Sequence, residues 1–171
     1  MLGFETELSA WGQAGSLLCR TLTRACDCLI NMPVVKDHSI AGVTISLKNM
    51  FGAIHNPNKY HDNGCDPYIA DVARHPFIAE KLRLTVLDGV RAQCHGGPAF
   101  RSSAVFDLAK VAASTDPVAI DAWAWTTIEH ERSRRGMRSL AEAGRPVRHL
   151  ETAAKHGLGV ADPDRLRVVE S

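Results

Sequence analysis

The sequence predicts an α/β fold, with a parallel or mixed sheet that carries helices on both faces. Short apolar runs of strand length alternate along the chain with longer segments whose apolar residues recur every three or four positions. A strong helix start at Asp116-Pro117 follows one of these runs. The 171 residues, 45% of them apolar, suffice for one core, so we expect a single domain over residues 1–171.

The first half of the chain predicts two helices around a strand, and then a loop. Residues 14–27 have apolar positions at helical spacing, and the apolar run 28–35 has the length of a buried strand. Residues 40–54 again show helical spacing. Residues 55–67 are rich in Asn, Asp, Gly, Pro and His, which is typical of a functional loop. A helix follows from Tyr68 and is interrupted by the next proline.

The second half predicts further strands and helices in alternation. Residues 83–88 form a strand that ends in a turn at Gly89, and residues 105–113 form the next one. The helix that begins at Pro117 is capped by Asp116. A final helix over 149–156 and a short strand over 166–169 complete the prediction.

Bulk properties exclude several classes of protein. A formal charge of +1 argues against nucleic acid as a partner. No run approaches the roughly 18 apolar residues of a membrane span, and no basic leader precedes an apolar core, so the sequence predicts a cytoplasmic protein. The five cysteines include only one close pair, Cys26 and Cys28, so no iron–sulfur or zinc motif is present. The signatures of serine hydrolases, zincins, NTPases and dinucleotide enzymes are also missing.

Polar residues at the predicted strand ends are the main candidates for a site. Ligands of such sheets bind outside the carboxyl ends of the strands. Lys36 and His38 follow the first strand, Asp88 the second and Asp116 the third, so we expect these groups to meet in one crevice. His38 suits acid–base chemistry or metal binding, and Lys36 suits anionic oxygens. A polar turn after a buried strand is the alternative.

Other candidates lie inside predicted helices or glycine turns. Lys48 and Asn49 interrupt an apolar helix, where the amine must find a partner or reach water. Asp121 lies near a helix start and is either catalytic or a structural acceptor. Gly96 and Gly97 permit close approach to a ligand, or simply form a turn.

The polar loop also supplies candidate metal ligands. His55, His61 and Cys65, together with His38, offer nitrogen and sulfur donors to a divalent metal ion. Their spacing matches no established motif, so unremarkable loop residues are the alternative.

Two motifs resemble a known family. The segment 30–38, with Pro33, Lys36 and His38, and the segment 42–52, with Lys48-Asn49, resemble the "PxxKxH" and "GxTxxxKNxxG" steps of the domain-of-unknown-function-362 family. Further matching pieces follow in order up to Asp121. The resemblance implies an uncharacterised α/β domain, of a kind often joined to iron–sulfur ferredoxin modules. Longer relatives have an N-terminal portion, so two alternatives stay open: a short member, or an incomplete half of a larger domain.

The sequence therefore leads to two hypotheses of different kinds. The first is an enzyme-like or redox-associated domain that binds a metal ion or a small anionic ligand. Its catalytic residues would be His38, Lys36, Asp116 and Asp121, and its ligand-binding residues Lys48, Asn49, Asp88, Gly96 and Gly97. The second is a non-catalytic binding or assembly module that acts with an iron–sulfur protein. A truncated relic without activity is a third alternative. A convergent pocket would favour the first hypothesis, and mutually saturated side chains the second.

Overall fold

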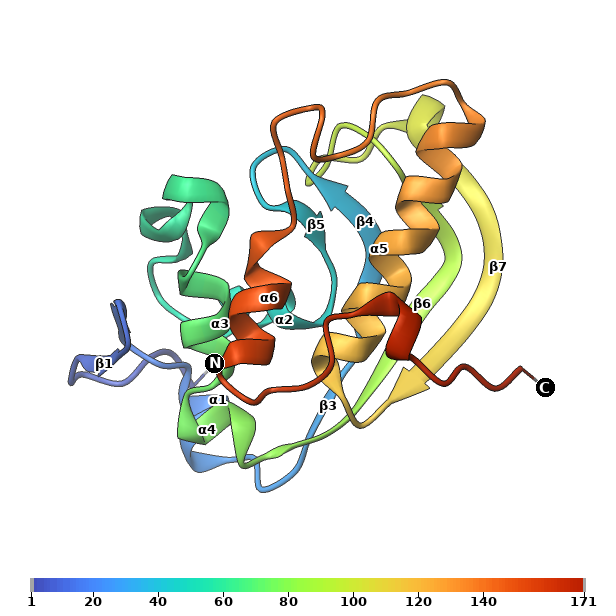
Figure 1. Cartoon of the computed structure of the whole chain (residues 1–171). Coiled ribbons are helices and arrows are strands. Elements are labelled where there is room, and N and C mark those ends of the chain that lie inside the picture. Colours follow the sequence, from blue (N-terminus) through green and yellow to red (C-terminus); the bar gives the residue numbers. More distant parts are fainter. Residues whose placement is uncertain (1, 171) are drawn as a thin grey trace.

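A five-stranded mixed sheet forms the centre of the computed structural model, which describes residues 2–170 (Figure 1). Its longest strand is β6 (Leu82–Gln93). On one edge of β6, first β3 (Leu29–Asn31) and then β4 (Val34–His38) pair with it in parallel, while β7 (Val105–Ser114) pairs antiparallel on the other edge. β5 (Gly42–Thr44) extends the sheet antiparallel to β4. The predicted α/β class with a mixed sheet is therefore confirmed.

Glycine and proline divide the N-terminal segments more finely than the apolar pattern indicates. The predicted helix over 14–27 is wrong in its first part, because β2 (Ala14–Ser16) pairs with β1 (Ser9–Trp11) and only α1 (Arg20–Arg24) is helical. Gly12, with a φ of 60°, closes the turn between β1 and β2. The predicted strand over 28–35 is split into β3 and β4 at Pro33, which has no N–H for the sheet.

The predicted helix over 40–54 is also wrong in its first part. Gly42, with a φ of 82°, ends a tight turn and is the first residue of β5. Val43 and Thr44 are β-branched and favour extended backbone. Helical backbone begins only with α2 (Ser46–Asn49) and continues in the 3-10 helix η1 (Met50–Ala53).

The polar segment over 55–67 contains two 3-10 turns, η2 (Pro57–Tyr60) and η3 (Asp62–Cys65). The helix predicted from Tyr68 is α3 (Tyr68–Ala73), and a second helix, α4 (Pro76–Ala79), begins at the interrupting proline. This prediction is confirmed, because proline fits the first position of a helix and not its interior.

β6 runs further than predicted. The predicted turn at Gly89 lies inside the strand, where a Cβ atom would come within 2.8 Å of the carbonyl oxygen of Lys110. The glycine therefore permits close approach of β7 and not a chain reversal. The short helix η4 (Ser102–Ala104) leads into β7, which has nearly the bounds predicted for it.

The C-terminal helices agree with the sequence. α5 (Pro117–Arg134) starts directly after Asp116, and α6 (Arg148–Lys155) occupies the predicted position. The predicted last strand over 166–169 is wrong: η5 (Pro163–Arg165) is followed by irregular chain.

The helices gather on one face of the sheet. α5 contacts β4, β6 and β7, α2 and α6 pack beside it, and α3 packs on α2 and α6 (Figure 1). On the opposite face, Ile30 is 54% exposed and Val111 is 66% exposed. Within residues 2–170, the predicted cover of helices on both faces is therefore not found.

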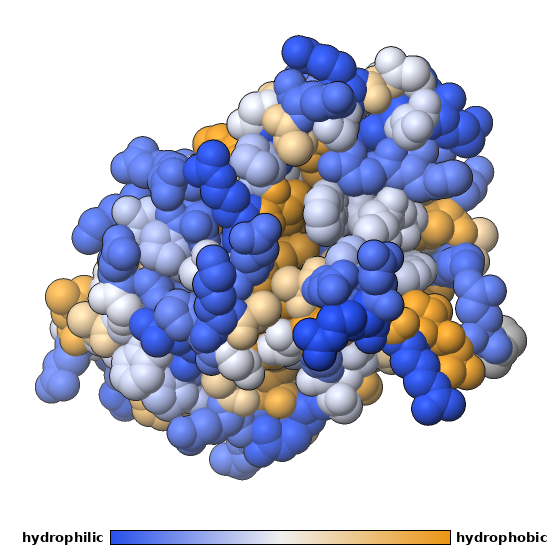
Figure 2. All heavy atoms as spheres, viewed as in Figure 1, coloured by the Kyte–Doolittle hydropathy of each residue, from blue (hydrophilic) through white to orange (hydrophobic). Residues whose placement is uncertain are grey.

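The side that carries α5 and α6 is mostly polar. Figure 2 shows hydrophilic side chains over most of this side, with apolar surface in a strip between them and near the C-terminal segment. No helix within residues 2–170 combines the length and the hydropathy that crossing a membrane requires.

Candidate functional site

Two parallel strands, β4 and β6, have their carboxyl ends side by side, at the place where the sequence predicts a site. β4 and β6 run in the same direction, and Lys36 of β4 lies opposite Gln93 of β6. His38 is the last residue of β4. Lys36 and His38 are two positions apart, so their side chains leave the strand on the same face.

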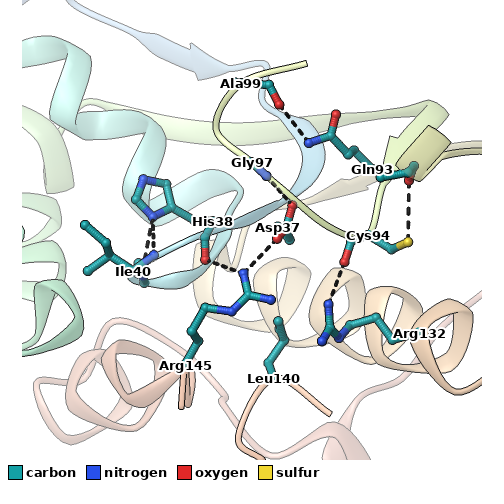
Figure 3. A network of polar contacts seen from close by, with 12 residues as sticks. Asp37, His38, Ile40, Gln93, Cys94, Gly97, Ala99, Arg132, Leu140 and Arg145 are labelled. Atoms are coloured by element: carbon teal, nitrogen blue, oxygen red, sulfur yellow. Dashed lines mark hydrogen bonds and ion pairs between the residues drawn. The ribbon is translucent and has the colours of Figure 1, made fainter. Parts of the chain in front are cut away.

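His38 is held as a neutral imidazole. Its Nδ1 accepts hydrogen bonds from the backbone N–H groups of Ile40 and Ala41, both at 3.1 Å (Figure 3). Nδ1 therefore carries a lone pair, and the ring proton of the neutral form lies on Nε2. Burial, together with the positive charge of Lys48, lowers the pKa of His38 to about 3.

His61 lies against His38 in the opposite tautomer. Its Nδ1 is 3.1 Å from the carbonyl oxygen of Pro57, which can only accept, so Nδ1 carries the proton. Its Nε2 therefore presents a lone pair, 3.4 Å from Nζ of Lys48. The rings of His38 and His61 stack with their centroids 5.5 Å apart.

Lys48 is the buried cation at the centre of this group. Its side chain extends from α2, its Nζ lies 4.6 Å from the centroid of the Phe51 ring, and only 8% of the residue is exposed. Burial lowers its pKa, and Lys36 lowers it further. Among residues 2–170 no carboxylate forms an ion pair with Lys48; the acidic neighbour that acts on its pKa is the buried thiol of Cys65.

Asp37, which lies between Lys36 and His38, fixes the end of β4. Its buried carboxylate accepts from Nη1 of Arg145 and from the N–H of Gly97, both at 2.8 Å (Figure 3). Arg145 also donates to the carbonyl oxygen of His38 at 3.0 Å. A distant arginine therefore positions the residue before the candidate site, and no sequence spacing indicated this pair.

The two glycines predicted to approach a ligand instead approach the protein itself. A Cβ atom on Gly97 would overlap the carbonyl oxygen of Asp37, and one on Gly96 would overlap the side chain of Arg101. Gly97 also accepts the N–H of Ser39. The two glycines are therefore explained by the close packing of the loop after β6 against the end of β4.

The predicted carboxylates do not join the group around Lys48. Because β7 is antiparallel to β6, the carboxyl end of β7 lies at the opposite end of the strands from the carboxyl end of β6. Asp116, which follows β7, lies at that opposite end. Asp116 accepts from the N–H groups of Val118, Ala119 and Val160. Asp88 is exposed in the middle of β6 and accepts from the N–H of Val90. The predicted meeting of Asp88 and Asp116 with His38 is therefore not found.

Asp121 and Asn49 serve the fold around α2. The buried carboxylate of Asp121 accepts from the N–H groups of Ser46 and Leu47, at 2.6 and 2.9 Å, and burial raises its pKa to about 7. Asn49 donates to Oδ1 of Asn31. Each carboxylate oxygen of Asp121 thus accepts a backbone N–H group, which agrees with the alternative that Asp121 is a structural hydrogen-bond acceptor.

The predicted metal ligands are only partly together. His38, His61 and Cys65 lie near Lys48, whereas His55 packs edge-to-face on Phe4. Among residues 2–170 no group of three or more His, Cys, Asp or Glu side chains has the arrangement of a metal site.

Comparison with protein-family models decides the family. Residues 13–126 match the model described as Domain of unknown function (DUF362). The chain belongs to this family. Comparisons with curated proteins and with solved structures gave no match. The matched range contains β4, α2 and the polar loop, and thus every residue of the cluster formed by Lys36, His38, Lys48, His61 and Cys65.

One further residue of this DUF362 domain approaches the cluster from outside the matched range. His149 of α6 is 1% exposed, and neither of its ring nitrogens has a hydrogen-bond partner among the described residues. Burial, with the nearby charge of Lys48, lowers its pKa to about 3. A histidine on the apolar side of the predicted last helix was the only available signal, and such residues usually pack in cores.

One residue of the DUF362 cluster borders a hollow on the open face of the sheet. Lys36 is half-buried and lines this hollow of about 300 Å³ with Arg91, Gln93 and Phe100. The hollow is thus bordered by two cations and one aromatic ring. Lys36 belongs to both the hollow and the cluster.

Proposed function

We propose that this DUF362 domain binds a small anionic ligand at the carboxyl ends of β4 and β6. The observation that carries the proposal is Lys48, a buried amine that no carboxylate among residues 2–170 neutralises. A buried cation without a counter-ion is unfavourable, and an anion beside it relieves that cost.

The neighbours of Lys48 also favour an anion. Lys36 adds a second positive charge. His38 uses Nδ1 to accept two backbone N–H groups, so its Nε2–H group remains as a donor for a ligand. Lysine and neutral N–H groups together bind carboxylate or phosphate oxygens well. Because the described donors do not converge as metal ligands do, the anionic ligand is the better supported part of the original hypothesis.

Isothermal titration with sodium phosphate, sodium sulfate and sodium L-lactate tests the proposal. The Lys48→Met variant removes the amine and keeps a side chain of similar length, so we expect at least tenfold weaker binding, about 1.4 kcal/mol. Lys59→Met is the matched control, because Lys59 is exposed and lies over Tyr60. Circular dichroism verifies that each variant is folded.

The proposal fails if the folded wild-type protein binds none of the three anions, or if Lys48→Met binds them as well as Lys59→Met does. Either result would favour the alternative function, a non-catalytic assembly module that acts with an iron–sulfur partner.

A further inference from the structure

We propose that Lys48 is a nucleophile that forms an imine with the carbonyl carbon of a 2-oxo acid. This inference rests on the proposed anion site, because the carboxylate of the acid would be the bound anion. It adds a chemical step and a ligand class, and it uses the two histidines in different roles.

The geometry gives Lys48 a base. His61 donates its Nδ1 proton to Pro57, so its Nε2 lone pair faces Nζ of Lys48 at 3.4 Å. An imidazole nitrogen in this position accepts a proton from an attacking amine. The tautomer is set by a backbone carbonyl and therefore does not depend on the ligand.

The geometry also gives the carbonyl oxygen a donor. His38 holds its Nδ1 lone pair against two backbone N–H groups, which leaves Nε2–H as its free donor. The His38 ring stacks on the His61 ring, so this donor lies next to the base that faces Nζ of Lys48. A hydrogen bond from Nε2–H stabilises the negative charge that develops on the carbonyl oxygen during attack.

The charges around Lys48 suit an amine that reacts. Burial lowers the pKa of Lys48, Cys65 partly offsets this effect and Lys36 adds to it, so the pKa is lowered overall and the fraction of free amine at neutral pH increases. Lys36 is half-buried beside the hollow, where it can hold the carboxylate next to the carbonyl group. A 2-oxo acid has these two groups on adjacent carbons.

The step balances without an oxidant or a reductant. The free amine of Lys48 attacks the carbonyl carbon through Nζ, and His61 takes one proton from the nitrogen and passes it to the alkoxide oxygen, which gives the hydroxyl group of the carbinolamine. His61 then takes the second proton from the nitrogen and passes it to this hydroxyl group, which leaves as water while the C=N bond forms. His38 contributes a hydrogen bond and transfers no proton.

Borohydride trapping with pyruvate tests the inference. The full chain is incubated with pyruvate and sodium borohydride, and peptide mass spectrometry locates any reduced adduct. We expect one adduct on the peptide that contains Lys48. It should be absent from Lys48→Arg, which keeps the charge, and retained in the exposed-lysine control Lys59→Met. His61→Gln should slow trapping at least tenfold, because it removes the base.

L-lactate separates failure of this inference from failure of the anion site, since it has the same carboxylate and no carbonyl group. If lactate binds and pyruvate is not trapped, the anion site stands and the imine is wrong. If neither compound binds, both proposals are wrong. Adducts spread over exposed lysines such as Lys59 would also overturn the inference.

Discussion

Near Lys48, the contacts of each imidazole decide its chemical state. Backbone N–H groups hold the lone pair of His38, a backbone carbonyl holds the proton of His61, and His149 has neither kind of partner within residues 2–170. Three identical side chains thus become a donor, an acceptor and a buried neutral ring. Sequence spacing identified the first two as candidates, but their tautomers depend on partners that only the fold supplies.

His149 should make the protein less stable in acid. Its pKa is lowered from 6.5 to about 3, so between these values the unfolded chain binds a proton that the folded chain does not. The free energy of unfolding therefore falls as the pH falls through this window, by about 1.4 kcal/mol per pH unit from this group. His38 acts in the same direction, and Asp121, whose pKa is raised to about 7, in the opposite one.

The His149→Leu variant isolates this contribution. Urea denaturation at several pH values between 6.5 and about 4 should show a slope smaller by about 1.4 kcal/mol per pH unit than in the wild type. His130→Leu, which removes an exposed histidine of α5, is the control for loss of an imidazole. Equal slopes in His149→Leu and the wild type would show that His149 is not buried as a neutral ring.

At the scale of elements, the side chain of Asp121 joins the start of α2 to α5. Asp121 lies one turn into α5, and its carboxylate accepts the first two N–H groups of α2. This attachment places Lys48, the residue after Leu47, beside His61. The position of the candidate nucleophile therefore depends on a helix that contributes no residue to the cluster.

Replacement of Asp121 by alanine should be costly. It leaves the N–H groups of Ser46 and Leu47 buried without an acceptor, so we expect a loss of about 3 kcal/mol in the free energy of unfolding. Asp116→Ala removes the half-buried cap of α5 and should cost about 1 kcal/mol. Denaturant titrations measure both values. If Asp116→Ala proves the more damaging of the two, α2 does not depend on Asp121.

The sequence predicted the elements best where a cap or a proline marked the start of a helix. The cap and the first-position proline of α5 were sufficient to locate it, and Pro76 divided α3 from α4 as expected. It failed over 40–54, where a strand and a helix share one run of apolar residues. It also failed for Asp116, because an apolar run does not reveal whether β7 runs parallel or antiparallel to β6.

At the scale of the molecule, the two faces of the sheet differ in how much they bury. Leu87 is fully buried in the core, while Val111, on the other face of the sheet, is 66% exposed. Strand alternation predicted which residues share a face. It could not predict which face the helices would cover, since both carry apolar residues.

Paired alanine substitutions test this asymmetry. Leu87→Ala should cost about 3 kcal/mol in the free energy of unfolding, because it opens a cavity in the core. Val111→Ala should cost less than about 1 kcal/mol, because the side chain already contacts water. Thermal or urea unfolding at low protein concentration gives both values. Equal costs would mean that something covers the outer face in solution.

The central position of β6 also bears on the order of folding. Leu29 pairs with Leu82, and Val34 with Asp88, so β3 and β4 find their main partner only far along the chain. During synthesis both strands leave the ribosome well before β6 exists, and such distant pairings form slowly. The β4–β5 hairpin is local and can form early. The end of β4 that carries His38 can therefore take shape before the sheet that supports it.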